Sequence, residues 1–333
     1  MPNKPAEPVT TLETNVKKTI VGLLLVLGVV ACAAEAFPAR PVRIVVAAAP
    51  GGLVDISTRL VAQKMSEGLG QPVIVENRAG ADTLLGIRYV KGAPADGYTV
   101  LATSNSIASQ MAVRQDPGYD LAKDFVGVGL VVRSPWVMVV APSEPDRSVR
   151  EFIERAKARP KDLSFASGGV GTTPYLAAET FLQQAGLKLL HIPYKGNGAA
   201  MPDVMSGRVT MIFDGVSSSA GKIRAGQLRA LGVSSMQRLA AFPDIPTIAE
   251  QGLPDFSSYV SIGLLVPSGT PKETVDKLSI ALRGAIATKE VRQRFEADGA
   301  ETVAVTPEEY TESLKREVVQ MGKLASELGL QKQ

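Results

Sequence analysis

The sequence predicts an α/β protein in which two lobes each carry a doubly wound sheet. Short apolar runs rich in β-branched residues alternate with segments whose apolar residues recur at helical spacing, which is typical of strands joined by crossover helices. Two of these runs, one in each half of the chain, break into glycine-rich turns that open a helix. The chain has 333 residues, of which 45% are hydrophobic and 21% charged, so it is long enough for two globular domains of ordinary size.

The composition excludes several classes of partner and chemistry. The net charge is +3, the basic residues are spread along the chain and aromatic residues make up only 5%, so we expect no nucleic-acid partner. One histidine and one cysteine in the whole chain do not favour a zinc site. No segment spells a phosphate loop or a Gly-x-Gly-x-x-Gly nucleotide motif, and we expect no cofactor.

Residues 1–36 are typical of a secretory signal. Lys17 and Lys18 precede an uninterrupted apolar segment, residues 20–34, which is shorter than the about 20 residues that a membrane span needs. The small-x-small pattern of residues 34–36 marks a cleavage site, so we expect cleavage after Ala36 and a secreted mature protein.

Cys32 is the only cysteine and lies inside this signal, so we expect no disulfide in the mature chain. Residues 29–32 also fit a lipoprotein box, in which Cys32 becomes the lipidated first residue. Cleavage after Ala36 is favoured over this anchor because its recognition pattern lies immediately downstream.

The first predicted βα unit contains the first candidate binding turn. Residues 42–49 predict a buried strand, which Pro50, Gly51 and Gly52 end before a helix begins. A helix N-terminus beyond the carboxyl end of a parallel strand offers unpaired N–H groups and a partial positive charge, which favours a small anion. The alternative is that the two glycines only make a tight turn and that Asp55 only caps the helix.

Two further strands complete the first lobe, at about residues 72–76 and 98–102. The second of them leaves into a hydroxyl-rich loop, in which Ser104 and Asn105 either hold a ligand or cap the next helix. The later strands are predicted at residues 137–140, 164–166, 189–192, 209–213, 228–233 and 260–266.

Three helix starts carry Ser or Thr with Glu three residues on, the pattern of a capping box. The pairs are Ser148 with Glu151, Thr270 with Glu273, and Thr306 with Glu309, and in the last two a proline takes the first helical position.

The second lobe contains the second candidate binding turn, residues 167–173, between a strand and a helix. Within this turn Ser167, Gly171 and Thr172 supply backbone amides and hydroxyls where a helix begins. The two turns, one in each lobe, are therefore expected to face each other across a cleft.

The roles of other polar residues at strand ends have two interpretations. Asp214 either accepts a hydrogen bond from a ligand or caps a helix, and Tyr194 with Lys195 either faces the cleft or lies in a solvated turn. His191, in an apolar strand, is favoured as a buried structural ring over a catalytic base. Because no nucleophile elbow accompanies it, we expect no enzyme.

These motifs, in this order and spacing, resemble the Bug, or tripartite tricarboxylate transporter substrate-binding receptor, family of bacterial periplasmic proteins. The resemblance spans residue 37 to about residue 330. It is carried by Phe37-Pro38 with Pro41, Ile44-Val45-Val46, Pro50-Gly51-Gly52 with Asp55, Glu76-Asn77-Arg78, Asp96-Gly97-Tyr98-Thr99, Lys123-Asp124-Phe125, Ser167 to Thr172, Pro193-Tyr194-Lys195-Gly196, Phe213-Asp214, Pro246-Thr247 with Glu250, Gly252-Leu253-Pro254, and Pro267 with Gly269-Thr270-Pro271.

The resemblance implies a class II periplasmic binding fold, in which crossing strands form a hinge between two α/β lobes. Lobe 1 is then residues 37–138 with 261–333, and lobe 2 is residues 139–260. The family pattern implies that a small carboxylate binds between the lobes at the two glycine turns. This chain departs from the pattern after Arg78, where residues 79–84 replace a glycine-rich stretch, and Tyr175 stands where a histidine is common.

The resemblance also implies the function. We expect a monomeric periplasmic receptor that closes over a small organic carboxylate and presents it to the membrane subunits of a transporter. The alternative partner is a signalling protein, to which the receptor reports the closed state.

Overall fold

The computed structural model describes residues 1–3, 37–159, 161–297 and 299–332. The chain divides into two compact units, Met1–Ala39 and Arg40–Gln333, and the fold given below is that of the second unit. The apolar segment of the predicted signal, its cleavage site after Ala36 and the alternative lipidation at Cys32 lie outside the described residues. Within the described ranges, every helix is too short or too polar to cross a bilayer.

The described strands form one nine-stranded sheet, and its first half contains the parallel strands β1, β2 and β3. Val45, Ile87 and Leu101 are fully buried members of the apolar core of this half. The elements of this part of the chain are β1 (Val42–Val46), α2 (Leu53–Leu69), β2 (Val73–Asn77), η1 (Ala81–Thr83), α3 (Leu84–Lys91), β3 (Thr99–Ser104), α4 (Ser106–Val113) and α5 (Leu121–Asp124).

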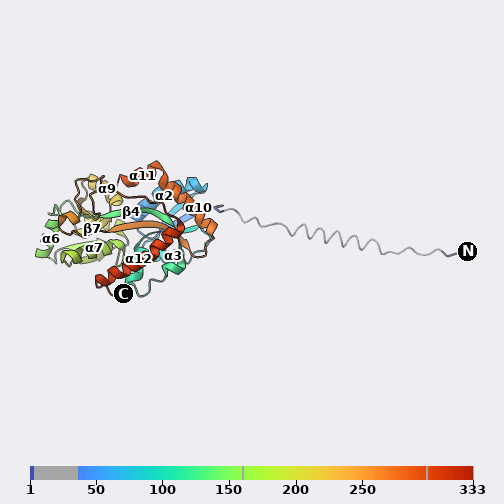
Figure 1. The fold of residues 1–333 in the computed structure, drawn as a ribbon, viewed down its shortest axis with the longest axis horizontal. Helices are drawn as coiled ribbons and strands as arrows, with labels where there is room; N and C mark the ends of the chain where they lie inside the picture. The colour runs from blue at the N-terminus through green and yellow to red at the C-terminus, as the bar shows by residue number, and fades with distance from the viewer. Residues whose placement is uncertain (4–36, 160, 298, 333) are drawn as a thin grey trace. The chain divides into compact units, whose positions relative to one another are not determined.

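Two long strands, β4 (Phe125–Val140) and β9 (Tyr259–Pro267), join the halves of the sheet. β4 pairs antiparallel with β9 up to Pro135, and from Trp136 onward it pairs antiparallel with β7 and β8. Figure 1 shows β4 running from the half that carries α10 and α12 into the half that carries β7 and α6. The sheet is therefore mixed, whereas alternating strands and helices alone predict a parallel one.

The second half of the sheet has its own core, in which Val204 and Ile212 are fully buried. β5 lies parallel to β6 and β7. The elements of this half are α6 (Val149–Ala158), β5 (Ser164–Ser167), α7 (Thr173–Ala185), β6 (Leu190–Pro193), α8 (Asn197–Met205), β7 (Met211–Gly215), α9 (Val216–Arg224), β8 (Arg229–Val233) and η2 (Ala249–Gln251).

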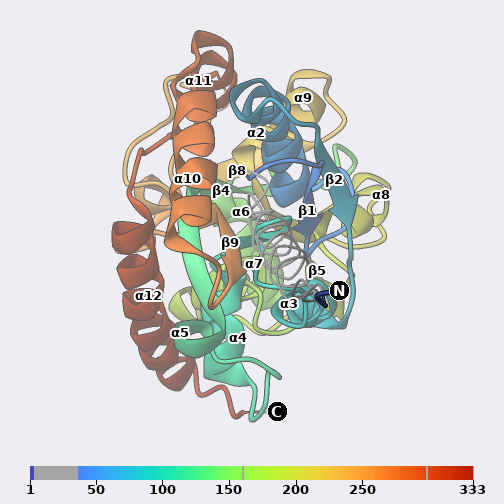
Figure 2. The same cartoon turned by 90° about the vertical axis from the view of Figure 1, so that its right-hand side faces the viewer.

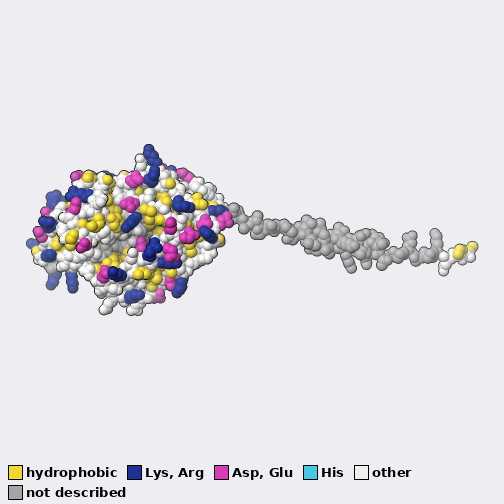
Figure 3. Space-filling view, in the orientation of Figure 1, with side chains coloured by type: hydrophobic (Ala, Val, Ile, Leu, Met, Phe, Trp, Pro, Cys, Tyr) yellow, Lys and Arg dark blue, Asp and Glu magenta, His cyan; other side chains and the backbone are white. Residues whose placement is uncertain are grey.

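The chain returns to the first half through its last helices, α10 (Lys272–Ala287), α11 (Lys289–Glu296) and α12 (Pro307–Glu327). α10 packs on α2, α12 packs on α4, and both contact β4 (Figure 2). On the face shown in Figure 3, basic and acidic side chains are interspersed over this unit.

The capping predictions have three outcomes. Thr306 and Glu309 form the expected capping box. Ser148 is the N-cap of α6, but the Glu151 carboxylate accepts from the Arg147 N–H in place of the Ser148 N–H. The prediction for Thr270 is wrong, because Pro271 is the N-cap of α10 and the Thr270 hydroxyl donates to the Pro267 carbonyl.

Gly263 of β9 provides a test of the packing between the crossing strands and α12. A Cβ atom at this position would lie 2.3 Å from Cζ of the buried Tyr310 ring. We expect Gly263→Ala to lower the free energy of unfolding by about 1–3 kcal/mol through overpacking, measured by chemical denaturation. Gly284→Ala is the matched control, because a Cβ atom there enters open space on α10 and helix propensity favours alanine. Equal stability of the two variants would contradict this packing.

Candidate functional site

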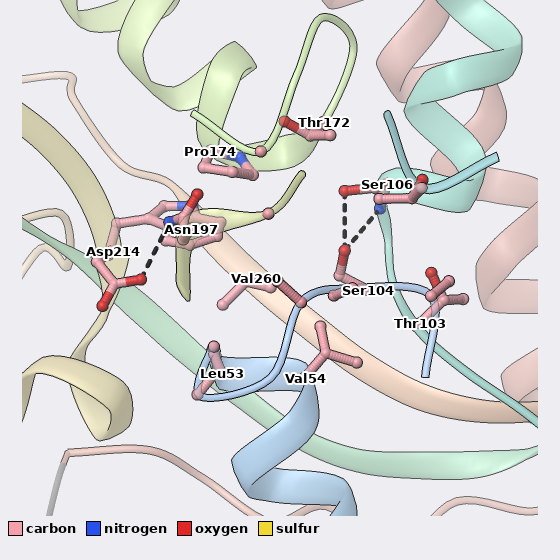
Figure 4. A pocket seen from close by; sticks show the side chains of 18 residues that line it. Leu53, Val54, Thr103, Ser104, Ser106, Thr172, Pro174, Asn197, Asp214 and Val260 are labelled. Atoms are coloured by element: carbon pink, nitrogen blue, oxygen red, sulfur yellow. Dashed lines mark hydrogen bonds between the residues drawn. The ribbon is translucent and has the colours of Figure 1, made fainter. Parts of the chain in front are cut away.

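A cavity of about 60 Å³ lies where the two halves of the sheet meet. Residues after β1 and at the end of β3 line it from the first half, and residues after β5, after β6 and at the end of β7 line it from the second. Trp136 of β4 and Val260 of β9 complete the wall. Figure 4 shows Leu53 and Val54, at the start of α2, on one side and Thr172 and Pro174, at the start of α7, on the other.

The first glycine turn is held in shape by Asp55. The Gly51 N–H donates to Asp55 Oδ2 at 2.9 Å, and Asp55 Oδ1 accepts from Arg59 and from Asn77. Gly52 lines the cavity, whereas Pro50, Gly51 and Asp55 do not. No side chain caps α2 within the described structure, so its first amides are open to another acceptor.

The second glycine turn is built in the same way from hydroxyl groups. Ser167 Oγ accepts from the Gly169 N–H at 3.1 Å, and Thr172 Oγ1 donates to the Gly169 carbonyl at 2.6 Å. Gly168 and Thr172 line the cavity, whereas Ser167 and Gly171 support the turn from outside the lining. Thr172 is the N-cap of α7 and makes no side-chain capping bond to it.

The loop after β3 connects the two halves. Ser104 and Ser106 line the cavity, and Ser104 Oγ donates to Ser106 Oγ at 2.8 Å. Ser106 Oγ in turn accepts from the Thr173 N–H at 3.0 Å, in the first turn of α7. Asn105 is turned away, and its side-chain oxygen accepts from the Ser261 N–H. Sequence reasoning missed Ser106, because its partner is distant in the chain.

Asp214 is a buried carboxylate at the end of β7, with 1% of its surface exposed. It lines the cavity and accepts from Asn197 Nδ2 at 3.0 Å, Ser218 Oγ at 2.5 Å and Ser219 Oγ at 2.6 Å. The two serines come from the first turns of α9, so the strand end and the helix start fix the carboxylate together. Asn197, which also lines the cavity, was missed by sequence reasoning.

The Tyr194 side chain bonds to Asp203 and does not line the cavity. Its hydroxyl donates to Asp203 Oδ2 at 2.7 Å, and loss of solvation together with this carboxylate raises the pKa of Tyr194 to about 12. Tyr194 and the exposed Lys195 line a separate surface hollow and not the cavity.

The two halves are in contact around the cavity. Gln110 Nε2 of α4 donates to the Val170 carbonyl in the second glycine turn and to the Asp82 carbonyl, both at 2.9 Å. Gly198 of α8 packs so closely on the first turn that a Cβ atom there would lie 2.5 Å from the Pro50 carbonyl oxygen. Direct contacts between the two halves therefore border the cavity.

Uncharged groups dominate the cavity wall. Among the residues that the structure describes, Asp214 is the one ionisable side chain that lines it, and none is a lysine, arginine or histidine. Over the same residues, no cluster of three or more His, Cys, Asp or Glu side chains is placed to hold a metal ion. An anion in this cavity is met by amides, hydroxyls and helix dipoles.

His191 supports the second glycine turn from below. Its ring stacks on Phe165 with centroids 4.8 Å apart, and its Nε2 lies 2.8 Å from Ser167 Oγ. Burial lowers the pKa of His191 to about 4, so the ring is neutral at pH 7. It does not line the cavity, in agreement with the structural role that the sequence favours.

Solved structures that resemble this chain include a periplasmic binding protein and two proteins with bound dicarboxylates. The chain is 32% identical to the periplasmic binding protein BugD, with a TM-score of 0.87 over 89% of this chain and 100% of that one. MatC of Rhodopseudomonas palustris with bound malate is 28% identical, with a TM-score of 0.83 over 86% and 99% of the two chains. R. palustris Rpa4515 with adipate is 30% identical, with a TM-score of 0.86 over 89% and 100%.

The sequence comparisons identify the family. The model of the tripartite tricarboxylate transporter family receptor matches residues 57–330. Protein BugT of Bordetella pertussis is 32% identical over 93% of this chain and 96% of its own length. A UPF0065 protein encoded in the tcbD-tcbE intergenic region of Pseudomonas sp. strain P51 is 38% identical over 89% and 88%. The chain thus belongs to the tripartite tricarboxylate transporter receptor family, as the sequence motifs predict.

This assignment settles the class of activity. The family and the fold are those of periplasmic solute-binding proteins and not of enzymes. The expectations of a binding receptor and of a two-lobed α/β fold with crossing strands are confirmed.

The lowered pKa of His191 predicts a pH-dependent stability. Between about pH 6.5 and pH 4 the unfolded chain binds a proton at this residue and the folded chain does not, so the free energy of unfolding falls as the pH falls. We expect the stability of the wild type relative to His191→Gln to decrease by roughly 1–2 kcal/mol from pH 7 to pH 4, because solvent around the partly exposed ring weakens the effect of the full shift; chemical denaturation at each pH measures this. A difference that stays constant over this range would contradict the neutral buried ring.

Proposed function

We propose that this protein is a periplasmic receptor that captures one small organic carboxylate between its two lobes and delivers it to the membrane subunits of a tripartite tricarboxylate transporter. The observation that carries the proposal is that the N-termini of α2 and α7, one from each half of the sheet, border the same cavity. Among the residues that the structure describes, no side chain caps α2, whereas the Thr173 N–H of α7 donates to Ser106 Oγ. Each helix terminus favours a negative group by roughly 0.3–1 kcal/mol from its dipole, and directed N–H bonds add to this. The malate and adipate bound to two related structures support a carboxylate.

The lobes of this proposal are residues 37–138 with 261–333, and residues 139–260. The separate apolar cores of the two halves support such rigid units, and the change of partners along β4 at Trp136 supports a hinge there. The ligand stabilises the closed form only through its greater affinity for that form, which requires contacts from both lobes.

The size of the cavity limits the ligand. A cavity of about 60 Å³ between the two halves is suited to a small molecule, and it favours a small acid over a peptide or a sugar chain.

The place of action follows from the predicted signal. We infer that residues 1–36 direct export, that cleavage follows Ala36, and that the mature chain works in the periplasm as a monomer. A mature N-terminus at Phe37, found by mass spectrometry of the exported protein, tests this; a lipidated Cys32 would contradict it.

The single tryptophan gives a direct assay of binding. Because Trp136 lines the cavity, all tryptophan fluorescence of the chain comes from that wall. We expect small carboxylates from a panel of malate, succinate, aspartate, adipate, lactate and propionate to shift this fluorescence with saturation, and to reduce the radius of gyration in solution scattering. If no acid of the panel binds in calorimetry, the proposed function is wrong.

Gln110 allows the closure of the lobes to be tested apart from direct contact with the ligand, because it bridges the two halves without lining the cavity. Of its two hydrogen bonds, the one to the Val170 carbonyl crosses between the halves and contributes about 0.5–1.5 kcal/mol to the closed form. We expect Gln110→Ala to raise the Kd of the tightest-binding acid of the panel about two- to tenfold in calorimetry. The control is Gln293→Ala on the exposed face of α11, which should leave the Kd unchanged. An unchanged Kd in Gln110→Ala would show that this bond does not hold the closed form.

A further inference from the structure

Three residues that line the cavity each carry a polar side-chain atom without a hydrogen-bond partner among the described residues. These atoms are Thr83 Oγ1, Trp136 Nε1 and Asn197 Oδ1, and all three atoms are buried. A buried polar group without a partner is costly, so several around one cavity indicate the groups that an occupant must bring.

The hydrogen-bonding role of Asn197 is fixed by its neighbours. Its Nδ2 donates to the Phe213 carbonyl at 2.8 Å and to Asp214 Oδ1 at 3.0 Å, and both of these partners are acceptors. The amide group therefore cannot be turned around, and the atom left free is the oxygen, which only accepts. The occupant must present a hydrogen-bond donor to Asn197.

Trp136 has the opposite requirement. Its indole N–H only donates, and the residue is 3% exposed at the point where β4 passes from one half of the sheet to the other. The occupant must therefore also present an acceptor, such as a carboxylate oxygen.

Thr83 reaches the cavity through an unusual backbone. Ala81, Asp82 and Thr83 have φ of 46°, 55° and 79°. This left-handed region is unfavourable for residues other than glycine, and most unfavourable for β-branched residues such as threonine. Asp82 is paired with Arg114, and its carbonyl accepts from Gln110, so the segment is held in place by α4. The strained conformation brings Thr83, whose hydroxyl both donates and accepts, to the wall of the cavity.

We propose that the cavity selects a small carboxylate that also carries a hydroxyl or amino group, and that Trp136, Asn197 and Thr83 determine this selection. This inference rests on the proposed function. The carboxylate lies at the helix N-termini within reach of the indole N–H, and the hydroxyl or amino group donates to Asn197 Oδ1. The buried Asp214 beside Asn197 repels a second negative group there and favours a donor.

The first test compares acids that differ only in the donor. Malate and aspartate carry a hydroxyl or an amino group that succinate lacks, and lactate carries a hydroxyl that propionate lacks. We expect the donor-bearing member of at least one pair to bind at least tenfold more tightly in calorimetry, and malate against aspartate distinguishes the hydroxyl from the amino group. If succinate and propionate bind as tightly as their partners, the selection is wrong although the receptor function stands. If none of these acids binds, the receptor function itself fails.

The second test removes the wall atoms one at a time. Asn197→Ala should weaken the donor-bearing acid to the affinity of its plain partner while leaving the plain acid within about threefold. Trp136→Phe should weaken both members of the pair at least tenfold. Equal losses for both acids in Asn197→Ala, or no loss in Trp136→Phe, would overturn the assignment, provided that circular dichroism shows folded variants.

Thr83 offers a readout that a purely structural residue would not give. Thr83→Gly removes the hydroxyl and relieves the left-handed backbone, so we expect the midpoint of thermal unfolding to rise while affinity for the donor-bearing acid falls at least fivefold. Thr83→Ser, which keeps the hydroxyl, should retain the wild-type affinity. If Thr83→Gly binds as tightly as the wild type, Thr83 takes no part in selection.

Discussion

The exchange of partners along β4 is the constraint on which the rest of the structure depends. One strand of 16 residues belongs to the sheet of the first half up to Pro135 and to that of the second half from Trp136. Because the backbone hydrogen bonds of both halves continue through this strand, the carboxyl ends of β1 and β3 and those of β5 and β7 meet at a common gap. Two separate cores and one shared cavity follow from this arrangement.

Local sequence signals identified the strands, the glycine turns and two of three helix caps, because each of these depends on residues adjacent in the chain. The antiparallel pairing was not predicted, because it joins strands that are distant in the chain. The early start of β4 was not predicted either, because Gly127, Gly129 and Pro135 interrupt its strand pattern. The residues of the candidate site likewise divide into those that local sequence predicts and those that only the fold reveals. Of the residues singled out, Gly52, Ser104, Thr172 and Asp214 line the cavity, whereas Trp136 and Asn197 matter only through neighbours brought together by the fold.

The glycine turns show how backbone amides are presented at a cavity wall whose described residues include no cationic side chain. Asp55 and Ser167 accept hydrogen bonds from backbone amides of the adjacent turn, so these side chains hold the shape of each turn. Within the described part of the chain no side chain caps α2, the Thr173 N–H of α7 donates to Ser106 Oγ, and the wall between them is mostly apolar or hydroxylic, with Asn197 and Asp214 as its amide and carboxylate. In such a site, recognition depends on the direction of hydrogen bonds more than on net charge.

The chemical nature of the contacts between the halves has a consequence for the medium in which the protein operates. Ser106, Ser109 and Gln110 join the halves through neutral dipoles, and neutral dipoles are little affected by dissolved electrolyte. We therefore expect the contacts between the halves, which use amides and hydroxyls, to keep nearly the same strength at low and at high ionic strength.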